Sequence, residues 1–221
     1  MKILLLGTPR SGTTSLYNLI KIHLDKIGHK SFIEPFNPEL YKKYLDGGHD
    51  FSTITPFDRY SNLFVKTLYM SNPYDYNNNV FQSNDEYIGW CLSYFDKIIF
   101  TERKDKKEQA ESFIINEEQS RIYGYSWHTP KIYKPDNIDN DNRLRMIKRF
   151  EDSSDDLRKI AIKNNYPIVF YEDLYYDQTH KEMERISDIL GIKFENNEIK
   201  EWILNRNRRV RIEHVVGKKI I

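Results

Sequence analysis

Short apolar runs alternate with longer amphipathic stretches along this chain of 221 residues. The first apolar run, Ile3–Leu6, has the length and composition of a buried strand. In Thr13–Lys26, leucine and isoleucine recur at helical spacing, and Lys30–Ile33 follows as a second short strand. Because a helix separates the two strands, this order predicts a βαβ unit and a parallel sheet.

The same alternation continues to the end of the chain. Further strands are predicted at Leu63–Leu68, Lys97–Thr101 and Pro167–Tyr171. Helices are predicted over Asp105–Ser120, Asn142–Lys163 and Asn197–Arg206. One more helix is expected after Thr179, which would form a capping box with Glu182, and Gly191 would end it. No Pro-, Gly- or Ser-rich linker interrupts the pattern, so we expect a single domain over residues 1–221.

Composition excludes several classes of partner. The formal net charge is +1, which gives no overall field for nucleic acid or an anionic membrane. The single cysteine, Cys91, cannot form an internal disulfide or a cysteine metal cluster; we expect it to be buried, in a protein of a reducing compartment. The six histidines lack HxxxH or HExxH spacing, so no metal is expected. No apolar stretch is long enough for a signal peptide or a membrane span, which favours a cytoplasmic protein.

The segment after the first strand has the features of a phosphate-binding loop. Gly7 and Gly12 have the spacing of the Walker loop, GxxxxGK[ST], but Thr13 fills the lysine position and Thr14 follows it. The cation is instead Arg10, inside the loop. Backbone N–H groups at the start of the following helix can bind an anion without the lysine. A kinase with a degenerate loop and a purely structural turn remain alternatives. The candidate anion-binding residues are Thr8, Pro9, Arg10, Ser11, Gly12, Thr13, Thr14 and Ser15.

The loop implies a P-loop-type three-layer α/β/α fold with a central, mainly parallel sheet. The strand Lys97–Thr101 leads into Arg103 and Lys104, and the next helix carries Ser112. Ligands of open parallel sheets bind at the strand ends, where a cation and a hydroxyl suit a phosphate group. A solvated, charge-rich helix is the alternative interpretation.

Two charged residues follow or interrupt apolar strands. Glu34 ends the second strand, beside Pro35, where its carboxylate can act as a general base; alternatively it caps a helix or pairs with Arg10. Lys66 lies within the apolar segment LFVKTL and, if buried, needs a partner or a ligand. The alternative places it on the solvent face of an edge strand.

His128, after Trp127, is a second candidate base or a hydrogen-bond donor.

These motifs resemble a known enzyme family. PRSGTTSL, residues 9–16, is similar to the 5′-phosphosulfate loop of sulfotransferases that use 3′-phosphoadenosine 5′-phosphosulfate (PAPS). RKDKKEQAES, residues 103–112, resembles the RRDKxxQAxS segment of bacterial trehalose-type carbohydrate sulfotransferases, with Lys104 replacing the second arginine. The segments EPF (34–36), SWH (126–128) and YEDL (171–174) resemble further parts of that family. In YEDL, read as a strand and turn, Glu172 and Asp173 would point to opposite sides and be structural.

The resemblance implies sulfuryl transfer from PAPS to a hydroxyl of a small molecule or carbohydrate, with adenosine 3′,5′-bisphosphate (PAP) as product. Arg10 would hold the 5′-phosphosulfate, Arg103 or Lys104 with Ser112 the 3′-phosphate, and Glu34 would be the base. Lys66 and His128 are further catalytic candidates. The basic segment near the C-terminus adds Arg208, Arg209 and Lys218 as candidates for the 3′-phosphate. A small-molecule kinase and a non-catalytic nucleotide-binding protein remain alternatives. The sequence specifies neither acceptor nor oligomeric state.

Overall fold

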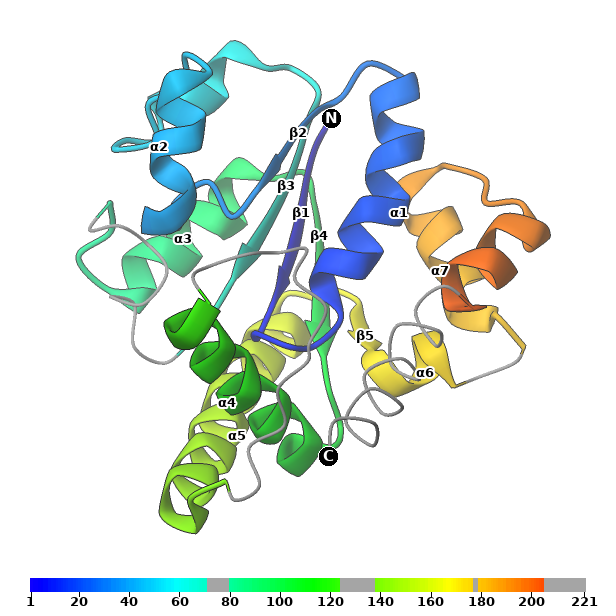
Figure 1. Cartoon of the computed structure of the whole chain (residues 1–221). Helices are drawn as coiled ribbons and strands as arrows, with labels where there is room; N and C mark the ends of the chain where they lie inside the picture. The colour runs from blue at the N-terminus through cyan, green and yellow to red at the C-terminus, as the bar shows by residue number, and fades with distance from the viewer. Residues whose placement is uncertain (71–79, 124–137, 177–178, 205–221) are drawn as a thin grey trace. The chain divides into compact units, whose positions relative to one another are not determined.

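Strands and helices alternate along the chain in the computed structural model of the protein (Figure 1). The structure describes residues 1–70, 80–123, 138–176 and 179–204. The strands are β1 (Lys2–Gly7), β2 (Lys30–Ile33), β3 (Leu63–Leu68), β4 (Lys97–Glu102) and β5 (Ile168–Phe170). The α-helices are α1 (Thr13–Lys26), α2 (Pro38–Asp46), α3 (Asn84–Tyr94), α4 (Lys106–Tyr123), α5 (Asn140–Lys163), α6 (Tyr171–Tyr175) and α7 (Lys181–Leu190), with a 3-10 helix η1 (Thr55–Arg59). Residues 196–204 are also helical.

The five strands form one sheet in the order β2-β3-β1-β4-β5, and every pair is parallel. This confirms the predicted central parallel sheet. β1 lies between β3 and β4, so Gly7 at its end is in register with Leu68 on one side and Thr101 on the other. The loop that follows β1 therefore starts at the carboxyl edge of the sheet, where ligands of such sheets bind.

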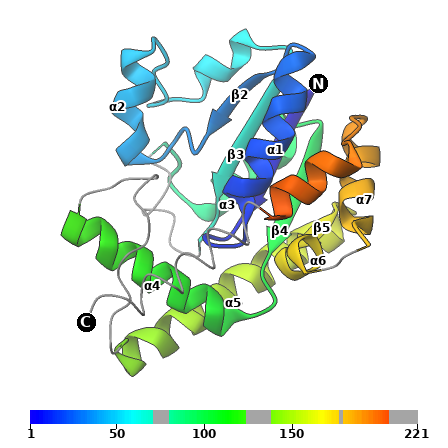
Figure 2. The same ribbon diagram turned by 45° about the vertical axis from the view of Figure 1, so that its right-hand side comes forward.

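Both faces of the sheet are covered, which explains why the strands are continuous apolar runs. Leu4 and Val65 belong to the core cluster that also contains Tyr87 and Trp90 of α3. On the opposite face, the ring of Tyr17 from α1 stacks on that of Phe64 with 4.9 Å between centroids. Figures 1 and 2 show α1 and α3 on the two sides of the sheet. Because side chains alternate along a strand, Lys66 points to the same side as Phe64, toward α1.

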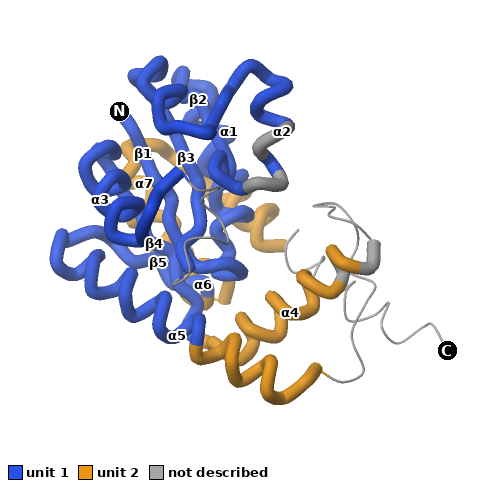
Figure 3. Tube along the Cα trace, turned by 90° about the vertical axis from the view of Figure 1, so that its left-hand side faces the viewer, with its two compact units in different colours: residues 1–104, 149–171 blue, residues 105–148, 172–221 orange. Residues whose placement is uncertain are grey.

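The chain separates into two compact units (Figure 3). Unit 1 contains the whole sheet, and the single-domain organisation stays a prediction. Within unit 2, an ion pair joins Arg143 of α5 to Glu111 of α4, with 3.4 Å between Nη1 and Oε1. The rings of Tyr175 and Trp202 also lie in contact, 4.9 Å apart. The units are Met1–Lys104 with Arg149–Tyr171, and Asp105–Lys148 with Glu172–Ile221.

The YEDL segment was predicted wrongly as a strand and turn. β5 ends at Phe170, and the next residues form α6, in which the Tyr176 N–H donates to the Glu172 carbonyl at 2.9 Å. Neighbouring residues on a helix are separated by about 100°, so the argument from opposite strand faces does not apply. The Glu172 carboxylate instead accepts the backbone N–H of Asp105 at 3.0 Å. This contact, not a position on a strand, is what the structure shows for the Glu172 side chain.

Two helix starts also differ from the expectations. α7 begins at Lys181 with His180 as its N-cap, so the predicted cap at Thr179 is wrong; Gly191, with φ 67°, does end the helix. α3 was not predicted, although its signal is present: Ser83 accepts the Glu86 N–H at 3.1 Å. Cys91 lies on this helix and is buried, as expected.

Candidate functional site

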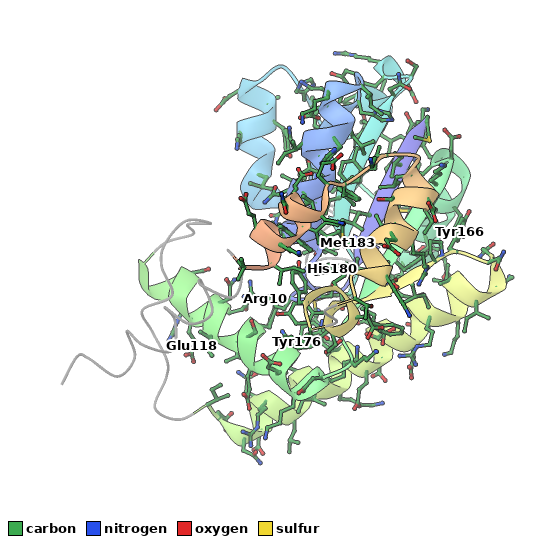
Figure 4. All side chains as sticks on the ribbon, turned by 90° about the vertical axis from the view of Figure 1, so that its right-hand side faces the viewer. Arg10, Glu118, Tyr166, Tyr176, His180 and Met183 are labelled. Carbon is green, nitrogen blue, oxygen red and sulfur yellow. The ribbon has the colours of Figure 1, made fainter. Side chains whose placement is uncertain are left out.

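The segment between β1 and α1 is a tight loop with two left-handed residues, Arg10 (φ 64°) and Gly12 (φ 81°). The first helical bond of α1 runs from the Leu16 N–H to the Gly12 carbonyl at 3.1 Å. N–H groups of a first helical turn have no acceptor within the helix, and the helix dipole adds positive potential there. Arg10 is half-buried and lies at this helix start (Figure 4). Of the predicted loop residues, Thr8, Pro9, Ser11 and Thr13 are buried, and Arg10, Gly12, Thr14 and Ser15 are half-buried.

The loop is packed directly against β4. A Cβ on Gly7 would lie 1.9 Å from Thr101 Oγ1 and 2.7 Å from the Thr101 carbonyl oxygen, so only glycine fits. The same Thr101 hydroxyl lies 3.0 Å from Ser11 Oγ, which donates to the Thr8 carbonyl at 2.7 Å. Sequence reasoning did not select Thr101, because its contact with the loop depends on β4 being the neighbour of β1.

A buried ion pair lies at the ends of β2 and β3. Lys66 Nζ pairs with Glu34 Oε1, and the two side chains are 1% and 4% exposed. Asn37 Nδ2 donates to the other carboxylate oxygen, Oε2, at 3.0 Å. The Glu34 backbone has φ 46°, and its N–H donates to the Lys66 carbonyl at 2.6 Å. β3 lies inside the sheet, so the interpretation of Lys66 as an exposed residue of an edge strand is wrong.

The pKa of Lys66 is lowered, although the causes act in opposite directions. Burial lowers the pKa of Lys66, the charge of Glu34 and its hydrogen bond raise it, and the nearby charge of Arg10 lowers it further. Burial also raises the pKa of Tyr44 to about 12; its hydroxyl bonds to the backbone of Ile33, next to Glu34. The charge of Arg10 is therefore close enough to the pair to affect the pKa of Lys66.

Of the two adjacent cations after β4, Arg103 is the one that faces the loop. Its side chain is 4% exposed, and its guanidinium lies 4.3 Å from the centre of the Tyr171 ring. Its Nη1 lies 3.5 Å from the Arg10 carbonyl oxygen. Lys104 is exposed, with its ammonium over the Phe170 ring. The two cations therefore differ in burial although they are adjacent in the sequence.

These residues make the carboxyl edge of the sheet an electropositive site. Arg10, Lys66 and Arg103 bring positive charge to this edge, where Lys66 pairs with Glu34. Together with the start of α1, this arrangement can hold a multiply charged anion. The site is chemically suited to a phosphate or sulfate ester.

The remaining predicted residues belong to unit 2 or lie outside the described residues. Ser112 lies on α4, in unit 2, and is half-buried. Trp127, His128, Arg208, Arg209 and Lys218 lie outside the described residues. All of these assignments stay predictions.

In the ranges that the structure describes, no three His, Cys, Asp or Glu side chains gather as metal ligands. No described helix combines the length and the apolar character that a membrane crossing needs.

Comparisons with known proteins find likeness in structure only. The chain is similar to a mouse sulfotransferase (SULT7A1) crystallised with PAP, with 18% identity and a TM-score of 0.55 over 91% of this chain and 62% of the other. It is also similar to retinol dehydratase crystallised with retinol and PAP, with 16% identity and a TM-score of 0.50 over 91% of this chain and 63% of the other. No family model and no curated protein sequence matches it. The chain thus spans less than two thirds of either protein, and at these identities the likeness establishes a shared fold, the P-loop α/β fold of sulfotransferases.

Proposed function

We propose that this protein is a PAPS-dependent sulfotransferase that transfers a sulfuryl group to a hydroxyl of a small-molecule or carbohydrate acceptor and releases PAP. The observation that carries the proposal is the phosphate loop, which lacks the Walker lysine and instead contains Arg10, whose carbonyl lies near the buried Arg103. The likeness of fold to two proteins crystallised with PAP supports the same ligand. A cytoplasmic location and a kinship with trehalose-type enzymes are parts of the same proposal.

The donor would be held by the loop and by Arg103. Residues Thr8 to Ser15 would bind the 5′-phosphosulfate through backbone N–H groups and Arg10, which would stabilise the charge that develops on PAP as it leaves. Arg103, rather than Lys104, would bind the 3′-phosphate, because it is buried on the loop side of β4. Ser112, Arg208 and Lys218 complete the proposed 3′-phosphate site.

Glu34 is the proposed general base. In the reaction, a bond forms between the acceptor oxygen and sulfur, the bond from sulfur to the PAP phosphate oxygen breaks, and the acceptor proton goes to the base. The carboxylate lies at the end of β2, and Lys66 and Asn37 fix its orientation. Lys66 would also offset negative charge near the transferred group, and His128 is the proposed alternative base. General base catalysis contributes about 100- to 10,000-fold.

The first test is calorimetric titration of the protein with PAP, with AMP and Mg·ATP as competing ligand classes. We expect PAP to bind more tightly than AMP, since only PAP has the 3′-phosphate. Arg103→Ala should weaken PAP binding at least tenfold, whereas Lys104→Ala, which removes a neighbouring cation of equal charge, should change it less than threefold; these are order-of-magnitude expectations for a charge-assisted contact. Preference for Mg·ATP over PAP would refute the proposal in favour of a kinase.

The second test concerns the base. Glu34→Gln should leave PAP affinity near that of the wild type but reduce sulfate transfer from PAPS, assayed across a panel of sugars and other alcohols. The assay temperature must be one at which circular dichroism shows the variant to be folded. Full activity of the variant would move the base elsewhere, and His128→Ala is then the next variant. A variant that loses turnover and keeps PAP binding is what a catalytic carboxylate predicts.

A further inference from the structure

The phosphate loop is connected to β4 through a chain of three oxygens. Ser11 is fully buried, and both its N–H and its hydroxyl lie within hydrogen-bond distance of the Thr8 carbonyl, at 3.3 and 2.7 Å. Its hydroxyl oxygen also lies 3.0 Å from Thr101 Oγ1. Thr101 is 1% exposed. The side chain of Ser11 is therefore turned into the protein, toward Thr8 and Thr101.

The direction of these hydrogen bonds follows from counting protons. A serine hydroxyl has one proton, and a carbonyl oxygen can only accept. Since Ser11 gives its proton to the Thr8 carbonyl, the contact with Thr101 is satisfied only if Thr101 donates to Ser11. The Thr101 hydroxyl thus donates to Ser11, and the Ser11 hydroxyl donates to the Thr8 carbonyl.

This connection holds a loop whose backbone is conformationally costly. Arg10, with φ 64°, adopts a left-handed conformation that costs a non-glycine residue on the order of 1–2 kcal/mol. Such a residue persists only where its surroundings hold it. Ser11 follows Arg10 in the chain and is bonded to Thr101, and β4, which carries Thr101, is paired on both sides, with β1 and β5.

We infer that Thr101 is a positioning residue, which acts through Ser11 to keep the phosphate loop in the shape that binds an anion. The inference rests on the proposed role of this loop as the donor site. Because Thr101 is 1% exposed, it would act through Ser11 and not by touching the anion. Its contribution is preorganisation, because a loop that is already in its binding conformation loses less entropy when the anion binds.

The test compares substitutions at two equally buried threonines, Thr101 and Thr67. Thr101→Val keeps the shape of the side chain and removes the donor, and Thr101→Ser keeps the donor. Thr67→Val is the control. Thr67 is also 1% exposed and lies on β3, the other neighbour of β1. It accepts a hydrogen bond from the Tyr87 hydroxyl at 3.1 Å, on the face that points away from α1. PAP affinity is measured by calorimetry and thermal stability by circular dichroism for each variant.

We expect Thr101→Val to weaken PAP binding about five- to tenfold, as the loss of one buried hydrogen bond would. Thr101→Ser and Thr67→Val should remain within about twofold of the wild type. Wild-type affinity in Thr101→Val would overturn the inference. So would an equal loss in Thr67→Val, because affinity would then follow general stability rather than the loop.

A double-mutant cycle covers the case in which Thr101→Val does not fold. Ser11→Ala removes the same connection from the loop side, and Ser11→Ala combined with Thr101→Ala should bind PAP no more weakly than Ser11→Ala alone, because the hydrogen bond between the two side chains is already lost. A further loss in the double variant would overturn the inference. If the wild type binds ATP but not PAP, the proposed function fails. The role of Thr101 is then tested by measuring the ATP affinity of the same variants. A wild type that binds neither anion overturns both.

Discussion

The buried pair of Lys66 and Glu34 allows the sharpest prediction about stability. Removing either partner leaves the other charge inside the protein, because the two side chains are only 1% and 4% exposed. We consider Lys66→Met, which keeps the length of the side chain, and Glu34→Gln, which keeps the shape of the carboxylate. In Lys66→Met, the Glu34 carboxylate retains only the amide of Asn37 as a described hydrogen-bond partner.

The magnitude follows from the burial. An exposed pair would contribute about 0–1 kcal/mol, whereas breaking a buried pair costs about 3–5 kcal/mol. For a chain of this length, each kcal/mol lowers the melting temperature by about 2–4 °C, so each single variant should melt roughly 6–20 °C lower. The double variant, Glu34→Gln with Lys66→Met, should cost less than the sum of the two single changes, since neither charge is left unpaired.

The Glu34→Gln penalty should also depend on pH. Burial already lowers the pKa of Lys66 from its ordinary 10.5, and the loss of the Glu34 charge lowers it further. Between the folded pKa and the unfolded one, the unfolded chain binds more protons, so stability rises with pH in that window. The full penalty relative to the wild type is therefore present below the folded pKa of Lys66 in the variant. It should shrink as the pH rises from there to the folded pKa of Lys66 in the wild type, which itself lies below 10.5.

Urea unfolding followed by circular dichroism, at pH 7 and in steps to pH 10, measures these free energies. Losses below about 1 kcal/mol in both single variants would show that the pair is exposed to water in solution. A double variant whose loss equals the sum of the single losses would show that Lys66 and Glu34 do not interact. An unchanged Glu34→Gln penalty across the pH range would contradict the titration of Lys66.

Two further predictions concern local packing. Gly7→Ala should destabilise the protein by about 1–3 kcal/mol or more, because the new methyl group meets the Thr101 carbonyl as well as its hydroxyl, and a Gly7→Ala/Thr101→Ala variant should not recover the loss. Gly89→Ala is the control in the same urea assay: it lies in α3 with open space around it and should stabilise by about 0.5–1 kcal/mol. Ser83→Ala should cost about 1 kcal/mol through loss of the α3 cap, and an unchanged midpoint would mean that this cap does not form in solution.

Much of the fold could be predicted from local patterns. β1 and β3 are apolar runs between polar segments, and α1 has helical spacing directly after the loop glycines; all three have the predicted bounds or nearly so. These features are encoded within a few residues of the chain, through side-chain periodicity and backbone conformation. The YEDL segment was predicted wrongly because a short apolar run does not indicate where its strand ends, and the chain turns into α6 one residue after Phe170.

The sequence by itself determined that a strand, an arginine-containing loop and a helix follow one another, and that two cations end the fourth strand. Only the tertiary structure decided which residues meet at the loop. Lys66 is buried because β3 lies between β2 and β1, and Thr101 reaches Ser11 because β4 is the other neighbour of β1. The physical reason is that parallel strands are joined by long crossover connections. The spacing of residues along the chain therefore does not determine the order of the strands in the sheet, or which residues of different strands are in contact.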